Sequence, residues 1–225
     1  ELFLRFNANV RVMCVVDRDF EDVLHSLASH PLLYLTDGNS LETYAFNLPC
    51  LIKLISVVLG GFPISPPDLL RALTDVLRQV YAIRVANEKL RWNMGGLCFT
   101  RYVSVVGTQV QFDSEGFTKA YLQKNRKFKD KTEFDSVLAE CLRSLPLDST
   151  RNIRGHDLCE LLLLLIRRLR RGRQFGNSET LEGVLLGTVE VCDLETHPLF
   201  QKIKDFRSAN NTSETIVANR AEGSR

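Results

Sequence analysis

The sequence has no pair of cysteines at the CxxC spacing that zinc sites and redox motifs use. The cysteines stand far apart instead, and most of them lie within apolar runs. They are Cys14, Cys50, Cys98, Cys141, Cys159 and Cys192. We therefore expect buried free thiols in a reducing compartment, which favours a cytoplasmic protein.

A long hydrophobic run is also absent. The longest, Leu158–Ile166, is interrupted by Glu160 and is far too short to span a bilayer. No secretory signal is visible, so we expect no association with a membrane. The chain has 29 Lys and Arg against 27 Asp and Glu, a formal net charge of only +2. A surface for nucleic acid would therefore need local clustering of basic residues.

What is present suits one mixed domain, because 225 residues with 44% hydrophobic and 25% charged side chains exclude wholesale disorder. Residues 10–16 form a β-branched apolar run typical of a buried central strand. Residues 20–27 have helical spacing, and residues 32–35 predict a second short strand. Strand, helix and strand predict a parallel crossover, so we expect a small α/β core near residues 1–48.

Beyond this core the sequence predicts a large, mostly helical region over residues 49–207, followed by a polar tail over 208–225 without regular structure. The helical patterns cover residues 51–58, 66–90, 114–124, 131–145 and 157–171. A β-hairpin is predicted over 97–112, with Gly107 and Thr108 as its turn.

Two carboxylates, Asp17 and Asp19, come directly after the first predicted strand. Ligand sites of open α/β sheets lie at such strand ends, and hard cations such as Mg²⁺ prefer oxygen ligands. The DxD pair therefore predicts a divalent-metal site. The structural alternative is that Asp19 caps the next helix and Asp17 is a turn residue.

A second acidic pair follows the next predicted strand. Asp37 comes directly after that strand, and Glu42 lies just inside a helix that Ser40 is expected to cap. Four carboxylates at one edge would repel one another without a cation, and metal-assisted phosphoryl chemistry requires such a cluster. The alternative for Glu42 is a favourable position at a helix N-terminus. His25, His30 and His197 show no metal-ligand spacing.

Basic residues gather in the second half of the chain. Arg154 and His156 lie in a predicted turn before Asp157, at a helix N-terminus, where they could face a phosphate. Arginines crowd the end of the same helix, at Arg167, Arg168, Arg170, Arg171 and Arg173. Both groups could contact RNA or DNA backbone. The structural alternative is that the residues at the start of the helix cap it and that the arginines form a solvated helix end. Residues 124–131 form another basic cluster, which contains Phe128.

Three segments carry a resemblance to a known family: VVDRDF at 15–20, YLTDGNSLETY at 34–44 and IRGHDL at 153–158. In this order they resemble the Toprim-like nucleases encoded beside ABC-type ATPases in bacterial anti-phage operons, the group that includes the effector subunit of the PARIS system. The resemblance implies a small Toprim-like parallel sheet and a nuclease that cleaves RNA, tRNA included, or DNA. It also implies an ABC-type ATPase partner and a homodimer when active.

The resemblance assigns the metal pair, for Mg²⁺ or Mn²⁺, to Asp17 and Asp19. With the strand-end argument, the expected catalytic residues are Asp17, Asp19 and Glu42, and the expected metal ligands are Asp17, Asp19 and Asp37. The residues expected to bind nucleic acid are Arg154, His156, Arg167, Arg168 and Arg171.

The family also uses a glutamate on an earlier strand, followed by a glycine, and Glu1 fits neither that distance nor that context. Either the glutamate precedes Glu1, which is not an initiator methionine, or the protein has lost it. In the second case the chain would be a non-catalytic interaction subunit that binds the ATPase. A haloacid-dehalogenase-type phosphatase would also place DxD after a buried strand. Its motif usually continues to Thr or Val where this chain has Glu21, which argues against it.

Overall fold

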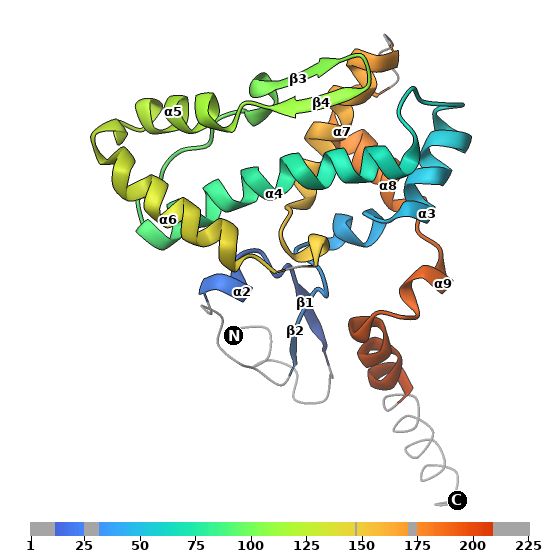
Figure 1. Cartoon of the computed structure of the whole chain (residues 1–225). Coiled ribbons are helices and arrows are strands. Elements are labelled where there is room, and N and C mark those ends of the chain that lie inside the picture. The colour runs from blue at the N-terminus through green and yellow to red at the C-terminus, as the bar shows by residue number, and fades with distance from the viewer. Residues whose placement is uncertain (1–11, 25–31, 147, 171–174, 209–225) are drawn as a thin grey trace, which may run out of the picture.

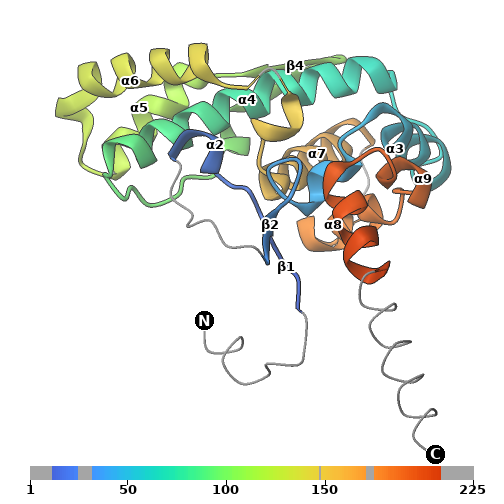
Figure 2. The ribbon, with the colours of Figure 1, turned by 90° about the horizontal axis from the view of Figure 1, so that it is seen from below.

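The computed structural model of the chain describes residues 12–24, 32–146, 148–170 and 175–208. The long helix α4 runs through the middle of the molecule, with a β-hairpin on one side and a small parallel sheet on the other (Figure 1). Seen from below, α5 and α6 lie at one end of α4, while α3, α7, α8 and α9 gather at the other (Figure 2). The fold is therefore mixed α/β and mostly helical, as predicted.

The strands are β1 (Cys14–Val16), β2 (Leu33–Leu35), β3 (Val103–Val106) and β4 (Gln109–Phe112). The α-helices are α2 (Glu21–Leu24), α3 (Leu48–Lys53), α4 (Pro66–Leu90), α5 (Ser114–Lys124), α6 (Lys131–Ser144), α7 (Gly155–Arg170), α8 (Ser178–Leu186) and α9 (Val191–Leu194). Shorter helical turns are η1 (Leu41–Ala45), η2 (Leu54–Val58), η3 (Phe99–Tyr102), η4 (Phe128–Asp130) and η5 (Ser149–Arg151). A further helical stretch covers residues 198–208.

The small sheet consists of β1 and β2, which pair in parallel with Cys14 opposite Leu33 and Val16 opposite Leu35. The predicted parallel pairing is thus confirmed, and the predicted helix between the strands is described as far as Leu24. The expectation of a buried central strand is wrong, because all three residues of β1 are exposed. A sheet with two described strands has no central position, so its apolar residues stay partly open to solvent.

The sequence of α4 explains its length and its ends. Ser65 accepts a hydrogen bond from the backbone N–H of Asp68, and Pro66 at the first position lacks an N–H that would need a partner. The helix ends where Arg91 adopts a left-handed φ of 53°. One side of the helix is fully buried, at Leu69, Leu73, Val76, Leu77 and Val80. Packing against α3, α6 and α7 makes α4 the centre of the core.

The hairpin and the helices of the second half lie close to their predicted positions. Strands β3 and β4 pair antiparallel around Gly107, whose φ of 60° suits the tight turn. Helix α5 has the predicted bounds, and α6 and α7 agree with theirs to within two residues where they are described. The predicted polar tail beyond residue 208 lies outside the described residues. None of the described helices has the length and apolar character needed to cross a bilayer.

The expectation that most cysteines are buried holds for only half of them. Cys50, Cys141 and Cys159 are buried, whereas Cys14, Cys98 and Cys192 are exposed free thiols. Cys14 lies in β1, and its exposure follows from the open faces of the two-stranded sheet.

Candidate functional site

The acidic turn after β1, residues 17–20, is held in place from two directions. The backbone N–H groups of Arg18 and Asp19 both donate to the carbonyl of Asn39, at 2.9 and 3.1 Å. The carbonyl of Asp19 in turn accepts the Asn39 side-chain amide at 2.5 Å and the Tyr81 hydroxyl at 2.8 Å. Tyr81 is a buried residue of α4. The turn is therefore fixed both to the end of β2 and to the central helix.

Asp19 has a left-handed backbone, with φ of 47°. Residues other than glycine adopt this conformation infrequently, and it persists where surrounding bonds hold it, often at functional sites. The bonds from Asn39 and Tyr81 hold it here. The side chain of Asp19 is exposed and borders a cavity of about 410 Å³ that Asp17 and Phe20 also line. The turn thus presents two carboxylates to solvent from a rigid backbone.

The carboxylate of Asp17 lies in a field of like charge. Partial loss of hydration raises its pKa first, and the negative charges of Glu42 and Asp19 raise the pKa further. The backbone N–H of Leu41 and the positive charge of Arg154 act in the opposite direction. Asp17, Asp19 and Glu42 are therefore electrostatic neighbours, as the sequence predicted for a converging edge.

Glu42 occupies the tightest part of this edge. Its Oε2 is buried and has no hydrogen-bond partner among the described residues. The same oxygen would lie 2.1 Å from a Cβ added to Gly155, so a larger residue there would force Glu42 to move. The Ser40 hydroxyl, which was expected to cap the helix of Glu42, instead accepts the backbone N–H of Gly155 at 3.1 Å. Glu42 is thus pressed against the start of α7.

A further carboxylate, Glu182 of α8, reaches Glu42 from the helical region. Burial raises the pKa of Glu182, and the charge of Glu42 and a hydrogen bond with it raise the pKa further. Burial, with the charges of Glu182 and Glu42, also raises the pKa of Cys159 to about 12, which keeps that thiol protonated. Sequence reasoning missed Glu182, because nothing in its local pattern distinguishes it from a surface residue of a short helix.

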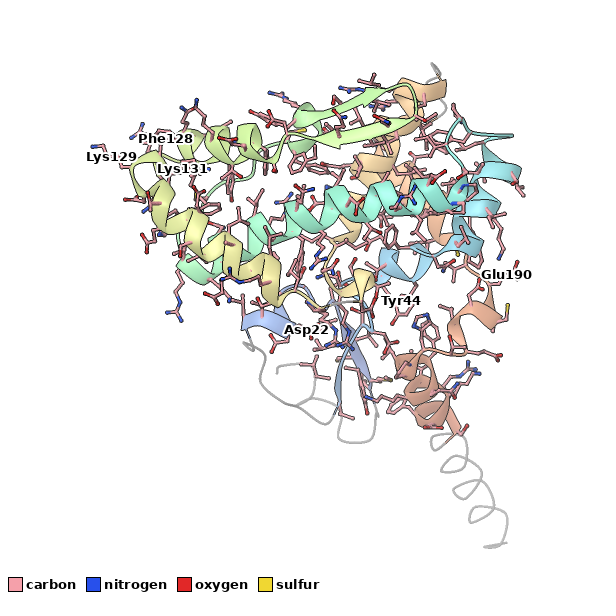
Figure 3. All side chains as sticks on the ribbon, in the orientation of Figure 1. Asp22, Tyr44, Phe128, Lys129, Lys131 and Glu190 are labelled. Carbon is pink, nitrogen blue, oxygen red and sulfur yellow. The ribbon has the colours of Figure 1, made fainter. Side chains whose placement is uncertain are left out.

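Asp37 forms its hydrogen bonds with other parts of the chain and not with the carboxylates around Glu42. Its carboxylate accepts the Tyr44 hydroxyl at 3.0 Å and the backbone N–H of Leu199 at 3.2 Å, and Nδ1 of His197 lies 3.7 Å from Oδ2. Burial raises the pKa of Tyr44 to about 12, so its hydroxyl stays a donor. Asp37 therefore anchors the 198–208 helical stretch beside η1. Figure 3 shows Tyr44 on one side of the small sheet and Asp22 of α2 on the other side of the sheet.

The acidic edge, formed by Asp17, Asp19 and Glu42, has some of the features of a Mg²⁺ site. Within the described residues, no group of three or more His, Cys, Asp and Glu side chains has an arrangement that could hold a metal ion. Mg²⁺ needs only one or two carboxylates, because it keeps several waters. The unpartnered Oε2 of Glu42 and the mutual repulsion of Glu42, Asp17 and Asp19 fit a nearby cation. Asp37 fits less well as a ligand, since its oxygens already accept two donors, the Tyr44 hydroxyl and the Leu199 N–H.

The predicted basic motif separates into three different environments. Asp157 is buried, and its two oxygens accept the Arg84 guanidinium at 2.7 and 2.8 Å. His156 is 58% exposed, and its ring lies 3.4 Å from the carboxylate of Glu160. Arg154 lies with its guanidinium carbon 6.0 Å from the centre of the Phe20 ring, next to the acidic turn. Only Arg154 thus combines positive charge with proximity to Asp17.

The arginines at the end of α7 bind the protein's own backbone where they are described. Arg167 donates to the carbonyls of Phe175 and Gly176, at 3.3 and 2.7 Å, and Arg168 donates to the carbonyl of Val103 at 2.8 Å. Arg171 lies outside the described residues. A role for these residues in nucleic-acid binding stays a prediction, and the observed contacts are structural.

The other basic cluster lies at the turn between α5 and α6. Phe128, Lys129 and Lys131 project from this tip, away from the small sheet (Figure 3). Phe128 is 42% exposed, whereas Lys131 pairs with Asp135. This surface is separate from the acidic edge.

Sequence reasoning also missed Asn39, Tyr81 and Arg84, which position the site. Asn39 had a visible signal, because it stands in the turn after the second strand. Tyr81 and Arg84 lie inside the long helix α4, where the helical period marks a buried face but not the partner of each side chain.

No protein-family model matches this sequence, and no curated protein is significantly similar to it.

Proposed function

We propose that the chain is a metal-dependent nuclease, the effector of an anti-phage defence system, which cleaves RNA or DNA under the control of a partner ATPase. The observation that carries the nuclease part is the rigid acidic turn, with Asp19 at a φ of 47° and with Asp17 beside Glu42. The defence setting, the ATPase and an active homodimer rest on the resemblance of three sequence segments alone.

The residues divide the work in a way that suits phosphodiester hydrolysis. Asp17 and Asp19 would hold Mg²⁺, and the bonds from Asn39 and Tyr81 keep the two carboxylates in place. Bound Mg²⁺ supplies stabilisation of charge on a phosphate and lowers the pKa of a water molecule. Arg154 offers positive charge to a phosphate on the same side. Glu42 would add negative charge beside this pair, which favours binding of the cation.

Glu182 would act as the general acid of this reaction. Because its pKa is raised by burial and by the charge of Glu42, it keeps its proton to a higher pH than an ordinary glutamate. A protonated carboxyl beside a charged one can donate to a leaving oxygen. In this proposal the acid therefore lies on α8.

The test is cleavage of tRNA and of plasmid DNA by the full-length protein, with Mg²⁺ or with EDTA. We expect cleavage that requires Mg²⁺ and falls by at least about 100-fold in Asp17→Asn. The matched control is Asp75→Asn, an exposed carboxylate on α4, which should cleave like the wild type. Calorimetric titration with Mg²⁺ gives a readout independent of activity. Cleavage that persists in EDTA, or in a folded Asp17→Asn protein, would refute the proposal.

The alternative is a non-catalytic interaction subunit of the ATPase complex, which the resemblance leaves open because Glu1 does not match the family glutamate. This alternative predicts a stable complex with the ATPase that is unaffected by EDTA, together with no cleavage of any substrate and no heat of Mg²⁺ binding.

A further inference from the structure

A second cavity opens on the other side of the acidic turn. It has a volume of about 260 Å³ and lies between that turn, the C-terminal part of α4 and α5. Its walls include Asp19, Phe20, Glu88, Tyr121 and Arg154. Asp19 therefore borders both this cavity and the larger one of about 410 Å³. A ligand in the smaller cavity would lie directly beside the proposed catalytic carboxylates.

Three polar side chains that line this cavity are held in place by hydrogen bonds within the protein. Arg84 is engaged by both oxygens of the buried Asp157. The side chain of Asn87 accepts the backbone N–H of Met94 at 3.0 Å, and the Tyr121 hydroxyl donates to the Met94 carbonyl at 3.3 Å. These groups hold the shape of the cavity before any ligand arrives, which lowers the entropic cost of binding.

Arg154 differs from these side chains. Its side chain forms no hydrogen bond and no ion pair with any residue in the described ranges, and its guanidinium carbon lies 6.0 Å from the centre of the Phe20 ring. Phe20 is itself supported from behind, since its ring packs on Tyr81 with a centroid distance of 5.4 Å. The cavity thus offers one cation without a bonded partner next to a braced aromatic face.

We propose that this cavity is a subsite for one unstacked nucleotide, with Arg154 on a phosphate and Phe20 against the face of the base. Aromatic and guanidinium planes are the surfaces on which proteins stack bases of single strands, and every base has such a face. Glu88, which also lines the cavity, supplies acceptor oxygens for the amino or imino groups of a base edge. A paired base inside a duplex cannot enter, so the strand must be single at this position.

The inference rests on the proposed function in one respect, namely that the nucleotide belongs to the strand being cleaved. The same chemistry would also fit a free mononucleotide that acts as an effector. The two sources share the phosphate and the base and differ in whether the flanking strand contributes to affinity.

The experiment is fluorescence anisotropy of labelled RNA and DNA of about twelve nucleotides, single-stranded or duplex, with the full chain in EDTA. We expect Arg154→Gln and Phe20→Leu each to weaken single-strand binding by about ten-fold or more and to leave duplex binding unchanged. Arg154→Gln should also reduce the salt dependence by about 0.7 in log-log slope. Arg101→Gln, which removes an exposed arginine of η3, is the matched control and should change neither affinity.

Single-strand affinities of both variants within about two-fold of the wild type would overturn the inference. Phe20→Leu needs a thermal melt as a folding check, because Phe20 packs on Tyr81. Arg154→Gln loses no hydrogen bond with a described residue and decides the matter if Phe20→Leu is unstable. Competition by mononucleotides, itself sensitive to Arg154→Gln, supports the subsite with a free nucleotide as its source. Absence of such competition, with the variant effects intact, supports the strand as the source.

The two proposals fail separately. If the variants weaken single-strand binding but no cleavage occurs with Mg²⁺, the nuclease proposal fails and the subsite stands. If cleavage requires Asp17 but is indifferent to Arg154 and Phe20, the subsite fails and the nuclease stands.

Discussion

The ion pair between Arg84 and Asp157 is the contact whose removal should cost the most stability. Asp157 is 1% exposed, and both of its oxygens accept the Arg84 guanidinium, at 2.7 and 2.8 Å. The pair joins the C-terminal part of the central helix α4 to the first turn of α7. Because Asp157→Ala leaves the partly buried Arg84 without its partner, we expect a loss of about 3–5 kcal/mol in the free energy of unfolding. That is a large part of the roughly 5–15 kcal/mol that holds a typical domain folded.

Urea unfolding followed by circular dichroism measures this loss, and a double-mutant cycle separates the pair from its surroundings. The cycle consists of Arg84→Met, Asp157→Leu and their combination; the double variant removes both charges and keeps apolar volume, so it should recover much of the loss that either single variant suffers. Arg71→Met is a control, because Arg71 is exposed and pairs with the exposed Asp68; its cost should stay below about 1 kcal/mol. A cost under about 1 kcal/mol for Asp157→Ala, or simple additivity in the cycle, would refute the reasoning.

Three smaller perturbations test the acidic edge. Gly155→Ala would place a Cβ 2.1 Å from Oε2 of Glu42, so it should destabilise the fold by about 1–3 kcal/mol, whereas Gly183→Ala, with open space around its Cβ, should stabilise α8 by about 0.5–1 kcal/mol. Equal thermal shifts of the two variants would contradict the contact with Glu42. Tyr81→Phe removes a hydrogen bond to the Asp19 carbonyl and should cost about 0.5–1.5 kcal/mol in urea unfolding, with weaker Mg²⁺ binding; unchanged values would show that the bond does not hold the turn. The raised pKa of Glu182 makes wild-type stability fall as pH rises above its ordinary value of 4.5, so the melting temperature of Glu182→Gln relative to the wild type should increase from about pH 4.5 to pH 7. A difference that is constant with pH would exclude the interaction with Glu42.

The elements whose stability is local could be predicted from the amino-acid sequence. The helix over 66–90 could be predicted because Ser65, the prolines after it and a helical apolar period agree with one another. The hairpin was visible because Gly107 and Thr108 stand between two alternating segments. The parallel pairing of β1 with β2 followed from a general rule of handedness and connection, without any knowledge of contacts.

Which of the charged residues share an environment depends on the packing of distant elements and could not be read from the sequence. Asp157 and Arg154 are three positions apart, yet Asp157 forms a buried ion pair with Arg84 of α4, whereas Arg154 lies beside the acidic turn. Glu182 reaches Glu42 across 140 positions of chain because α8 packs on η1. Local patterns record helical period and caps, but the partner of a side chain depends on how distant helices pack. The electrostatics of the site, and the exposure of β1, therefore came from packing that no single segment encodes.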